Sequence, residues 1–281
     1  MSAPGSSAPR LHERISPGET SFYGASLDEL AAYWRRLAPQ RVSFVSWTLL
    51  GADPASLRSL IDEGGYRVET ITHVFMADRH LTEDENDWVK ARSELSRLID
   101  VAKHIGARSI YLLTGGHGNL SWEQAAVAFC SAIAPCAAQA RAAGVLLLIE
   151  PASPLHADLS ITHSLRDTVE LAEMADIGVC IDWFACWTEA GLQRTIERAA
   201  PRCGIVQVSD YVYGDRSLPS RAVPGDGVIP LRRLLDWTLS AGYDGAFDLE
   251  LIGPRIEQEG RLQAVSRGAD RLGEMLRSLG A

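Results

Sequence analysis

The stretch VLLLIE, residues 145–150, guides the interpretation of the whole chain, because a single acid closes a run of five apolar residues. Such a run lacks the alternation of polar and apolar residues, which is typical of a parallel strand covered on both faces. Three later stretches repeat the pattern, and a polar residue stands at or near the end of each: GVCID (178–182), GIVQVSD (204–210) and AFDLE (246–250). Together they predict parallel strands that end in polar side chains.

Outward from these stretches, β-rich runs alternate with helical patterns along the whole chain. Repeated alternation predicts a parallel sheet, and eight such units close most naturally into a barrel. An open, doubly wound sheet is the alternative, but no G-x-G-x-x-G motif follows the first strand. The predicted strands are 10–16, 41–47, 66–75, 108–114, 145–150, 177–182, 203–210 and 245–251, and the predicted helices are 26–38, 54–65, 83–106, 121–144, 163–175, 188–200, 229–243 and 259–280.

The predicted fold class is therefore α/β, a (β/α)₈ TIM barrel that forms a single domain over residues 11–281. Residues 1–10 lack the basic-then-apolar order of a secretion signal, and we interpret them as a flexible N-terminal tail. No apolar run approaches the roughly 20 residues that span a bilayer. The five cysteines contain no C-x-x-C pair and suit reduced thiols, so the cytoplasm is the expected compartment.

Charge and lysine content exclude several classes of function. The net charge of -9 disfavours nucleic-acid binding, which needs a basic surface. The only lysines, Lys90 and Lys103, both fall in the predicted helix 83–106, which leaves a Schiff-base aldolase without a candidate nucleophile. We expect a small carbohydrate-like substrate and neither a nucleic acid nor a membrane as partner. A homo-oligomer is compatible with the sequence, although no segment identifies an interface.

The polar strand ends point to a metal site. In barrels of this kind the active site lies at the carboxyl ends of the strands, where Glu150, Asp182, Gln207 and Glu250 would converge. Three carboxylates and one amide oxygen are hard ligands that suit Mn²⁺ or Mg²⁺. Any one of the acids could instead cap a helix or pair with an arginine. Four polar groups at one level of adjacent strands favour one divalent metal ion per chain.

These residues resemble the xylose-isomerase-like barrels, which include sugar epimerases, hydroxypyruvate isomerase, inosose dehydratase and endonuclease IV. The resemblance covers the C-terminal half well and the N-terminal half only by the order of strands and helices. The resemblance implies one divalent metal held by the same four residues. At the position of Gln207 many members have histidine, whereas hydroxypyruvate isomerases are similar to this chain in having glutamine. The motifs that carry it are I-E-P at Glu150, I-D at Asp182, V-Q-V-S-D at 206–210, P-G-D-G at 224–227 and the run that ends at Glu250.

The resemblance implies a metal-dependent isomerase or epimerase of a small sugar, keto-sugar or hydroxy-keto acid. Glu150 and Glu250 would be the catalytic pair that moves a proton through an enediolate, since a cation beside a hydroxy-ketone makes its α-carbon more acidic. The same enediolate could expel a β-hydroxyl, so a lyase or dehydratase of an inosose, a dehydroshikimate-like compound or an oxidised glycoside is the alternative. A non-catalytic barrel subunit is a third hypothesis, which two opposed bases disfavour.

Further residues are candidates for substrate binding. Arg221 matches the arginine that precedes the P-G-x-G turn in sugar-binding relatives, and it could hold a hydroxyl, a carboxylate or a phosphate. Trp183 could stack on a sugar ring, as could Trp187, although buried aromatic side chains are the commoner case. Each of the others has a structural alternative, such as a hydrogen-bonded core histidine at the end of a strand. They are His73, His117, His156 and Asp210.

One departure from the resemblance bears on the reaction. Isomerases of the family often have D-x-x-H after the metal-binding aspartate, and that histidine contacts substrate, but this chain has Ala185 at the position. The replacement puts a straightforward isomerase in doubt. Together with Gln207, it also excludes the three-zinc cluster of endonuclease IV.

Overall fold

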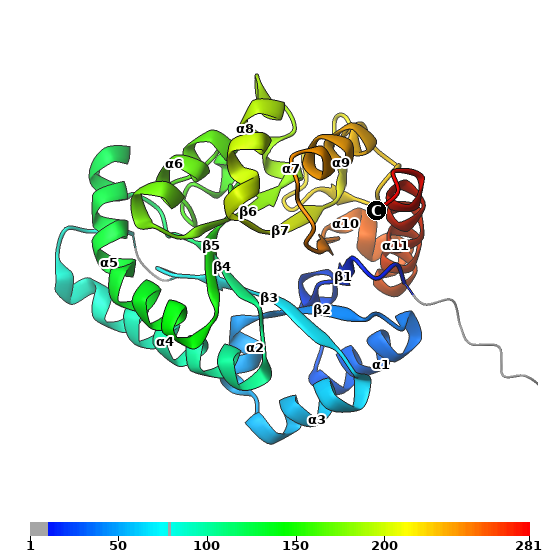
Figure 1. Ribbon diagram of the computed structural model, residues 1–281, viewed down its shortest axis with the longest axis horizontal. Helices are drawn as coiled ribbons and strands as arrows, with labels where there is room; N and C mark the ends of the chain where they lie inside the picture. Colours follow the sequence, from blue (N-terminus) through cyan, green and yellow to red (C-terminus); the bar gives the residue numbers. More distant parts are fainter. Residues whose placement is uncertain (1–10, 78–79) are drawn as a thin grey trace, which may run out of the picture.

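The computed structural model describes residues 11–77 and 80–281, and it has one eight-stranded parallel sheet in the order β1-β10-β7-β6-β5-β4-β3-β2. Helices surround the sheet (Figure 1), and the predicted (β/α)₈ barrel is confirmed. The strands are β1 (Ile15–Pro17), β2 (Arg41–Val45), β3 (Arg67–Val74), β4 (Ser109–Leu113), β5 (Leu146–Ile149), β6 (Gly178–Asp182), β7 (Cys203–Val208) and β10 (Phe247–Leu249).

The longer helices follow the predicted pattern and have recognisable ends. Ser26 and Ser121 each begin a helix with a reciprocal capping box, to Glu29 and Gln124 respectively. Gly106 and Gly144 end helices with positive φ angles of 71° and 73°, a conformation that favours glycine. The helices are α1 (Leu27–Leu37), α3 (Pro54–Gly64), α4 (Glu85–Ile105), α5 (Trp122–Ala143), α6 (Leu165–Ala175), α8 (Leu192–Ala199), α9 (Leu231–Ser240) and α11 (Arg261–Ser278).

Shorter elements occupy the loops and were not predicted. They matter because most of them follow the carboxyl end of a strand, where the candidate site lies. The short helices are η1 (Glu19–Phe22), α2 (Ser46–Gly51), η2 (Pro154–His156), α7 (Trp183–Cys186), η3 (Ala200–Arg202) and α10 (Pro254–Glu259), and a two-stranded antiparallel hairpin joins β8 (Asp210–Tyr211) to β9 (Arg221–Ala222).

The barrel is closed partly by side chains. Between β1 and β2 the structure has a single backbone bridge, from Gly18 to Ser43, in place of a full ladder. Beside it, the Ser16 and Ser43 hydroxyl oxygens lie 2.7 Å apart, and the Ser43 hydroxyl donates to the Asp248 carboxylate at 2.6 Å. These three buried residues belong to β1, β2 and β10, so a hydrogen-bond chain joins the strands across the seam.

The predicted first strand is longer than the strand that the structure has. Residues 10–16 were expected to be extended, but β1 comprises only Ile15–Pro17. Arg14 lies just before it and donates from its guanidinium to the carbonyl oxygens of Gly245 and Tyr243, at 2.9 and 3.1 Å. The polar residues at this end therefore tie β1 to the loop before β10 and do not extend the sheet.

Two apolar cores hold the fold together. The larger lies between the strands and the outer helices, and a smaller cluster fills the barrel interior. This double core is the usual construction of β/α barrels. The interior cluster consists of Tyr111, Leu148, Cys180, Ile205 and Ala246.

Helix α5 is long and apolar enough to cross a membrane by length and composition alone. Half of its most apolar window is buried against the rest of the protein, and it packs on α4, α6 and β5. A helix in the core of a soluble protein passes the same test. The packing of α5 therefore accounts for its apolar composition.

Glu19 supplies a buried acid near the start of the chain. Its carboxylate accepts hydrogen bonds from the Val45 backbone N–H at 2.9 Å and from the Thr48 hydroxyl at 2.6 Å, at the first turn of α2. Burial raises the pKa of Glu19 from 4.5 to about 7, although the two hydrogen bonds oppose the rise. The folded protein therefore retains a proton that the unfolded chain releases over this pH range.

We predict that the Glu19 carboxyl group makes the protein less stable as the pH rises from about 4.5 to about 7. The difference in free energy of unfolding between wild type and Glu19→Gln should fall by roughly 3 kcal/mol over that window and stay level above it. Urea unfolding at a series of pH values measures the difference. The exposed Glu63→Gln is the control, and a pH-independent difference for Glu19→Gln would contradict the prediction.

Candidate functional site at the carboxyl ends of the strands

Four polar side chains meet at the ends of four adjacent strands. Asp182 is the last residue of β6 and pairs in register with Gln207 of β7, while Glu150 and Glu250 directly follow β5 and β10. Glu150, Asp182 and Gln207 are buried, and the Glu250 side chain is only 12% exposed. The sequence-predicted set therefore lies together, in the order Glu250, Gln207, Asp182, Glu150 along the sheet.

Arg221 of β9 places a positive charge among these acids. Its Nη1 and Nη2 donate to the two Asp182 carboxylate oxygens at 3.2 and 2.9 Å, and Nη2 also lies 3.0 Å from Glu250 Oε2. The Ser209 hydroxyl accepts a further hydrogen bond from Nη1 at 3.1 Å. The Phe184 ring covers the guanidinium, with 4.6 Å from the guanidinium carbon to the ring centroid. The arginine is thus fixed from several sides.

Gln207 links the site to the barrel interior. Its amide nitrogen donates to Glu250 Oε2 at 2.7 Å and to the Tyr111 hydroxyl at 3.0 Å. Its amide oxygen lies 3.3 Å from the Cys180 sulfur, which donates to it. Because a half-turn of an amide exchanges oxygen and nitrogen, the same side chain can direct its oxygen toward Glu250 and its neighbours.

The electrostatics of the site follow from crowding three acids in a buried space. Burial raises the pKa of Glu150 well above its ordinary value, and the charges of Glu250 and Asp182 raise it further. Burial likewise raises the pKa of Glu250 to about 6, although Arg221 opposes the rise. Burial acts to lower the pKa of Arg221, but attraction to Asp182 and Glu250 outweighs it and raises that pKa. The acids carry more negative charge than one arginine balances.

The residues present fit a divalent cation by their donor chemistry. Glu150 Oε2 is buried and has no hydrogen-bond partner among the described residues, so it calls for a proton or a cation. Three carboxylates and one arginine leave a formal charge of -2, which one divalent ion would neutralise. As the side chains stand, residues 11–77 and 80–281 contain no ready-made group of three or more His, Cys, Asp or Glu for a metal. Where a metal ion would lie between Asp182 and Glu250, the structure has the Arg221 guanidinium.

Two other candidates have side chains that the structure shows to be hydrogen-bonded or covered. The Asp210 carboxylate accepts hydrogen bonds from the backbone N–H groups of Tyr211, Gly225, Gly227 and Ile229, at 2.8 to 3.0 Å, so it organises the P-G-D-G turn and is not available to substrate. Trp183 has no exposed surface and packs on Phe247, with ring centroids 5.9 Å apart. A sugar ring has no access to it.

The three histidines lie in different surroundings. His73 is buried, and its Nδ1 lies 3.0 Å from the Ser46 hydroxyl at the start of α2, on the side of β3 opposite to the inward Thr72. Burial lowers the pKa of His73 to about 4, which keeps the ring neutral. His117 lies on an exposed loop. His156 of η2 is half-buried, and burial lowers its pKa with a smaller contribution from the charge of Arg221.

Sequence reasoning missed Tyr111, Ser209 and Phe184. Tyr111 lies in a predicted strand, and the alternation of side chains along β4 could have placed it inside the barrel beside Gln207. Phe184 and Ser209 are close in sequence to Asp182 and Gln207, but no pattern indicates that both contact the Arg221 side chain.

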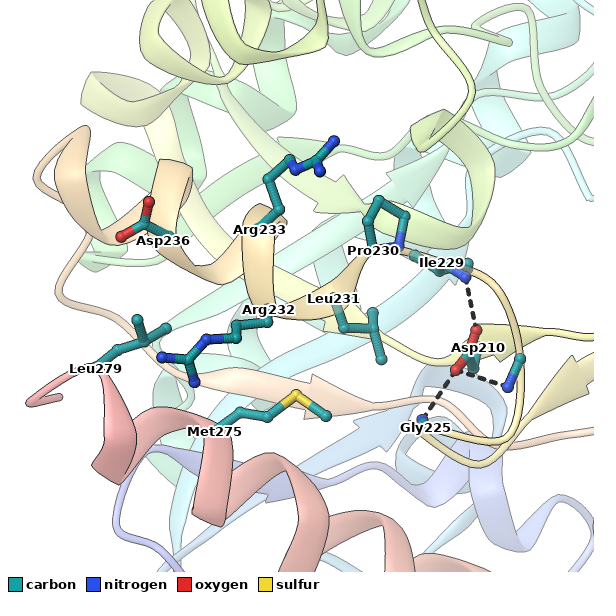
Figure 2. Close-up of a pocket in the computed structure, with 11 residues that line it drawn as sticks. Asp210, Gly225, Ile229, Pro230, Leu231, Arg232, Arg233, Asp236, Met275 and Leu279 are labelled. Carbon is teal, nitrogen blue, oxygen red and sulfur yellow. Dashed lines mark hydrogen bonds between the residues drawn. The ribbon is translucent and has the colours of Figure 1, made fainter.

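A groove of about 700 Å³ lies next to the Asp210 turn but outside the acidic site, and none of the four strand-end residues lines it. Figure 2 shows Asp210 at one end, hydrogen-bonded to the turn, while Arg232 of α9 extends toward Met275 and Leu279 near the C-terminus. A ligand in this groove could not bind the N–H groups of the turn, because the Asp210 carboxylate already accepts their hydrogen bonds.

The fold and the acidic cluster at its carboxyl face define a β/α barrel with a polar centre of the kind that binds small molecules. The sequence model of the family described as "Xylose isomerase-like TIM barrel" matches residues 36–275. The chain belongs to this family.

A curated relative, a putative hydroxypyruvate isomerase from Streptomyces coelicolor, is 28% identical over 168 residues, or 57% of this chain and 58% of the relative. The match therefore spans a little over half of that relative's length.

Solved structures share the fold. A protein from Sinorhizobium meliloti 1021 has a TM-score of 0.83 at 22% identity and covers 95% of this chain and 98% of its own. The IOLI protein with a bound zinc atom has a TM-score of 0.80 at 13% identity, with 95% and 99% covered. The 3-keto-D-glucoside 4-epimerase from E. coli has a TM-score of 0.74 at 15% identity, with 95% and 100% covered.

We predict that Arg221→Gln lowers the free energy of unfolding by about 3–5 kcal/mol at pH 8, because it leaves buried carboxylates without their cation. The loss should be smaller at pH 5, where the stranded acids take up protons. Urea unfolding at both pH values measures the effect. Arg255→Gln is the matched control, since Arg255 is 49% exposed and pairs with Asp215 in a surface ion pair. Equal, small losses for both variants would contradict the prediction.

Proposed function

We propose that the protein is a divalent-metal-dependent isomerase or epimerase of a small sugar, keto-sugar or hydroxy-keto acid, with Glu150 and Glu250 as the proton-transfer pair. One observation carries the proposal: the order Glu250, Gln207, Asp182, Glu150 along β10, β7, β6 and β5. The two glutamates stand at the ends of this arc, and Gln207 and Asp182 stand between them. A substrate above the middle of the arc would have one carboxylate on each side.

The four arc residues would hold the metal, which supplies Lewis-acid polarisation of a hydroxy-ketone and so acidifies its α-carbon. Glu250 and Glu150 would then take a proton from one carbon and return it to the same carbon or its neighbour through an enediolate. A half-turn of the Gln207 amide, whose nitrogen donates to Tyr111 and Glu250 at 3.0 and 2.7 Å, would present its oxygen to the metal. Oxygen ligands make Mn²⁺ or Mg²⁺ the preferred ion in this proposal.

Arg221 would orient the substrate from the same side as Asp182. A guanidinium presents its N–H groups in a rigid fork, so it can donate to a substrate hydroxyl or carboxylate beside the metal site. Its contact with the Phe184 ring, at 4.6 Å, would keep the fork in one plane while it changes hydrogen-bond partners. This role for Arg221 agrees with the sequence-based proposal.

The names of the similar proteins support an isomerase. The Streptomyces coelicolor relative is a putative hydroxypyruvate isomerase, and the E. coli neighbour is a keto-glucoside epimerase. The IOLI protein binds zinc, which supports a divalent ion without choosing Mn²⁺ or Mg²⁺. The five cysteines are free thiols, which supports a reducing compartment such as the cytoplasm.

A lyase is the second candidate, favoured by Ala185. The α7 helix supplies alanine where isomerases of the family often present histidine, so one substrate contact of the isomerases is absent here. Loss of a β-hydroxyl from the enediolate needs the same two carboxylates. The two reactions differ in product mass, because isomerisation conserves mass and dehydration releases water.

We predict that the wild-type protein binds about one Mn²⁺ or Mg²⁺ per chain, and that Glu150→Gln and Glu250→Gln each weaken binding at least tenfold. Each substitution removes a charged ligand and keeps the shape of the side chain. Isothermal titration with each metal salt, including Zn²⁺, measures the affinity, and Glu63→Gln is the control. No metal bound by the wild-type protein would overturn the proposed function.

With metal bound, a screen of keto-sugars and hydroxy-keto acids should yield a product of unchanged mass, and Glu150→Gln and Glu250→Gln should lose that activity. Mass spectrometry and NMR of the product read the result directly. A product lighter by one water would replace the isomerase by the lyase.

We also predict that Arg221→Gln binds Mn²⁺ at least tenfold more tightly than the wild-type protein. The guanidinium contacts both Asp182 and Glu250, so its charge opposes a second cation at those two ligands. Titration of metal-free protein measures the change, with Arg255→Gln as the control arginine. Unchanged or weaker Mn²⁺ affinity in Arg221→Gln would show that the arginine does not compete with the ion.

A further inference from the structure

A separate pocket lies at the opposite end of the barrel from the acids, where the strands begin. It has a volume of about 560 Å³ and lies between the end of α5, the start of β5 and the segments that lead into β6, β7 and β10. None of the four strand-end residues of the candidate site lines it. We call it the amino-end pocket, and its lining includes Arg108, Arg141, Leu146, Leu148, Arg202 and Tyr243.

The floor of the amino-end pocket is apolar. Leu148 of β5 lines the pocket and also belongs to the small cluster inside the barrel. Gly178 of β6 and Gly204 of β7 leave room for Leu148, because a Cβ atom at either position would lie within 2.7 Å of one of its methyl carbons. Leu146 adds apolar surface toward the solvent, since this side chain is 48% exposed. A ligand can therefore make apolar contacts in this pocket.

Arg108, directly before β4, brings a positive charge with spare hydrogen-bond donors to the pocket. Its guanidinium makes no hydrogen bond to the described residues and lies 3.7 Å from Glu69, which is already paired with Arg41. Burial raises the pKa of the Cys203 thiol to about 12, and Arg108 lies close enough for its charge to oppose the rise. Because Cys203 directly follows Arg202, these two arginines belong to neighbouring parts of the pocket wall.

Arg141 and Arg202 share one acid. Arg141 donates to the Asp176 carboxylate at 2.9 Å, whereas Arg202 lies 3.6 Å from that carboxylate and donates to the Ile177 carbonyl oxygen over a long 3.4 Å. With Asp244, the lining contains three arginines and two aspartates, a formal charge of +1 in a chain whose net charge is -9. The amino-end pocket therefore favours an anion.

The amino-end pocket is too far from the acids to belong to the proposed active site. Gly178 lines it at the start of β6, and Asp182 ends the same strand four residues later. At about 3.3 Å per residue, the two ends of the strand are roughly 13 Å apart. Cys180, midway along the strand, belongs to the apolar cluster that fills the barrel interior. A molecule in the pocket would contact the strands that carry the acids without reaching the acids.

We propose that the amino-end pocket is a second binding site, for a small molecule that carries one phosphate or carboxylate group on an apolar ring or chain. The guanidinium groups of Arg108 and Arg202 would bind the anion, because their planar sets of N–H donors match its oxygen atoms. Leu146 and Leu148 would contact the apolar part, as apolar side chains do in most pockets for small molecules.

Titration of metal-free protein with phenyl phosphate, benzoate, inorganic phosphate and benzyl alcohol tests the proposal, with dissociation constants measured by NMR. Wild type should bind one of the aromatic anions roughly tenfold more tightly than inorganic phosphate or benzyl alcohol, because only the aromatic anions use both the arginines and the apolar floor. The tighter aromatic anion identifies the charged group as phosphate or carboxylate. Metal-free protein makes this result independent of the proposed function.

Arg108→Gln and Arg202→Gln should each weaken binding of the aromatic anion by roughly fivefold or more. Leu146→Ser should reduce the advantage of the aromatic anion over inorganic phosphate. Arg198→Gln is the matched control and should bind as wild type does. Arg198 of α8 is 47% exposed, close to the 39% of Arg202, but it pairs with Glu173 and does not line the pocket.

Arg202 and Leu146 are partly exposed, so their variants keep the test decisive if Arg108→Gln, which removes one partner of the buried Glu69, is unstable. Binding of none of the four molecules would overturn the proposal. So would equal affinity for the aromatic anions and benzyl alcohol, inorganic phosphate bound as tightly as either aromatic anion, or affinity that Arg108→Gln and Arg202→Gln both leave unchanged.

Discussion

The ion cluster of Arg221 with Asp182 and Glu250, beside the buried Glu150, is the interaction on which the carboxyl face of the barrel depends. Asp182 ends β6, Glu250 follows β10, and the arginine that joins them belongs to a hairpin inserted after β7. Removing these charges from water is costly, and their mutual attraction repays the cost only when the hydrogen bonds are well formed. The pair of bonds to Asp182 and the further bond to Ser209 meet this condition, and together they fix one loop against two strands.

The buried polar groups of the candidate site are tolerated because the stability of the fold comes from its apolar cores. The larger apolar core lies between strands and helices, while the barrel interior combines a small apolar cluster with hydrogen-bonded polar side chains. Ser16, Ser43 and Asp248 join the strands at the seam, and burial raises the pKa of Asp248 to about 7. Polar side chains therefore serve two purposes in the barrel. Those at the seam between β1 and β2 close it, and those at the carboxyl ends of β5, β6, β7 and β10 form the candidate site.

The sequence predicted the barrel and the meeting of Glu150, Asp182, Gln207 and Glu250, because strands without alternation and their polar ends follow from local rules. It could not predict that Arg221 lies among the acids, since residues 211–230 have no periodicity that fixes a side chain. Asp210 was proposed as a substrate ligand, but its role depends on the backbone of a turn far along the chain. Nor could the sequence predict that Trp183 is fully buried, because a residue next to a site residue can still face the core.

The hairpin of β8 and β9 combines features that many enzymes distribute over several loops. It carries the arginine that balances the acids and the aromatic rings of Tyr211 and Tyr213, and Asp210 anchors its base to the following turn. The barrel strands take no part in the segment 212–220. Variation confined to this one insertion therefore changes both the charge of the centre and the surface around it while the strand-end acids stay as they are, and a change at Arg221 also lowers the stability of the fold.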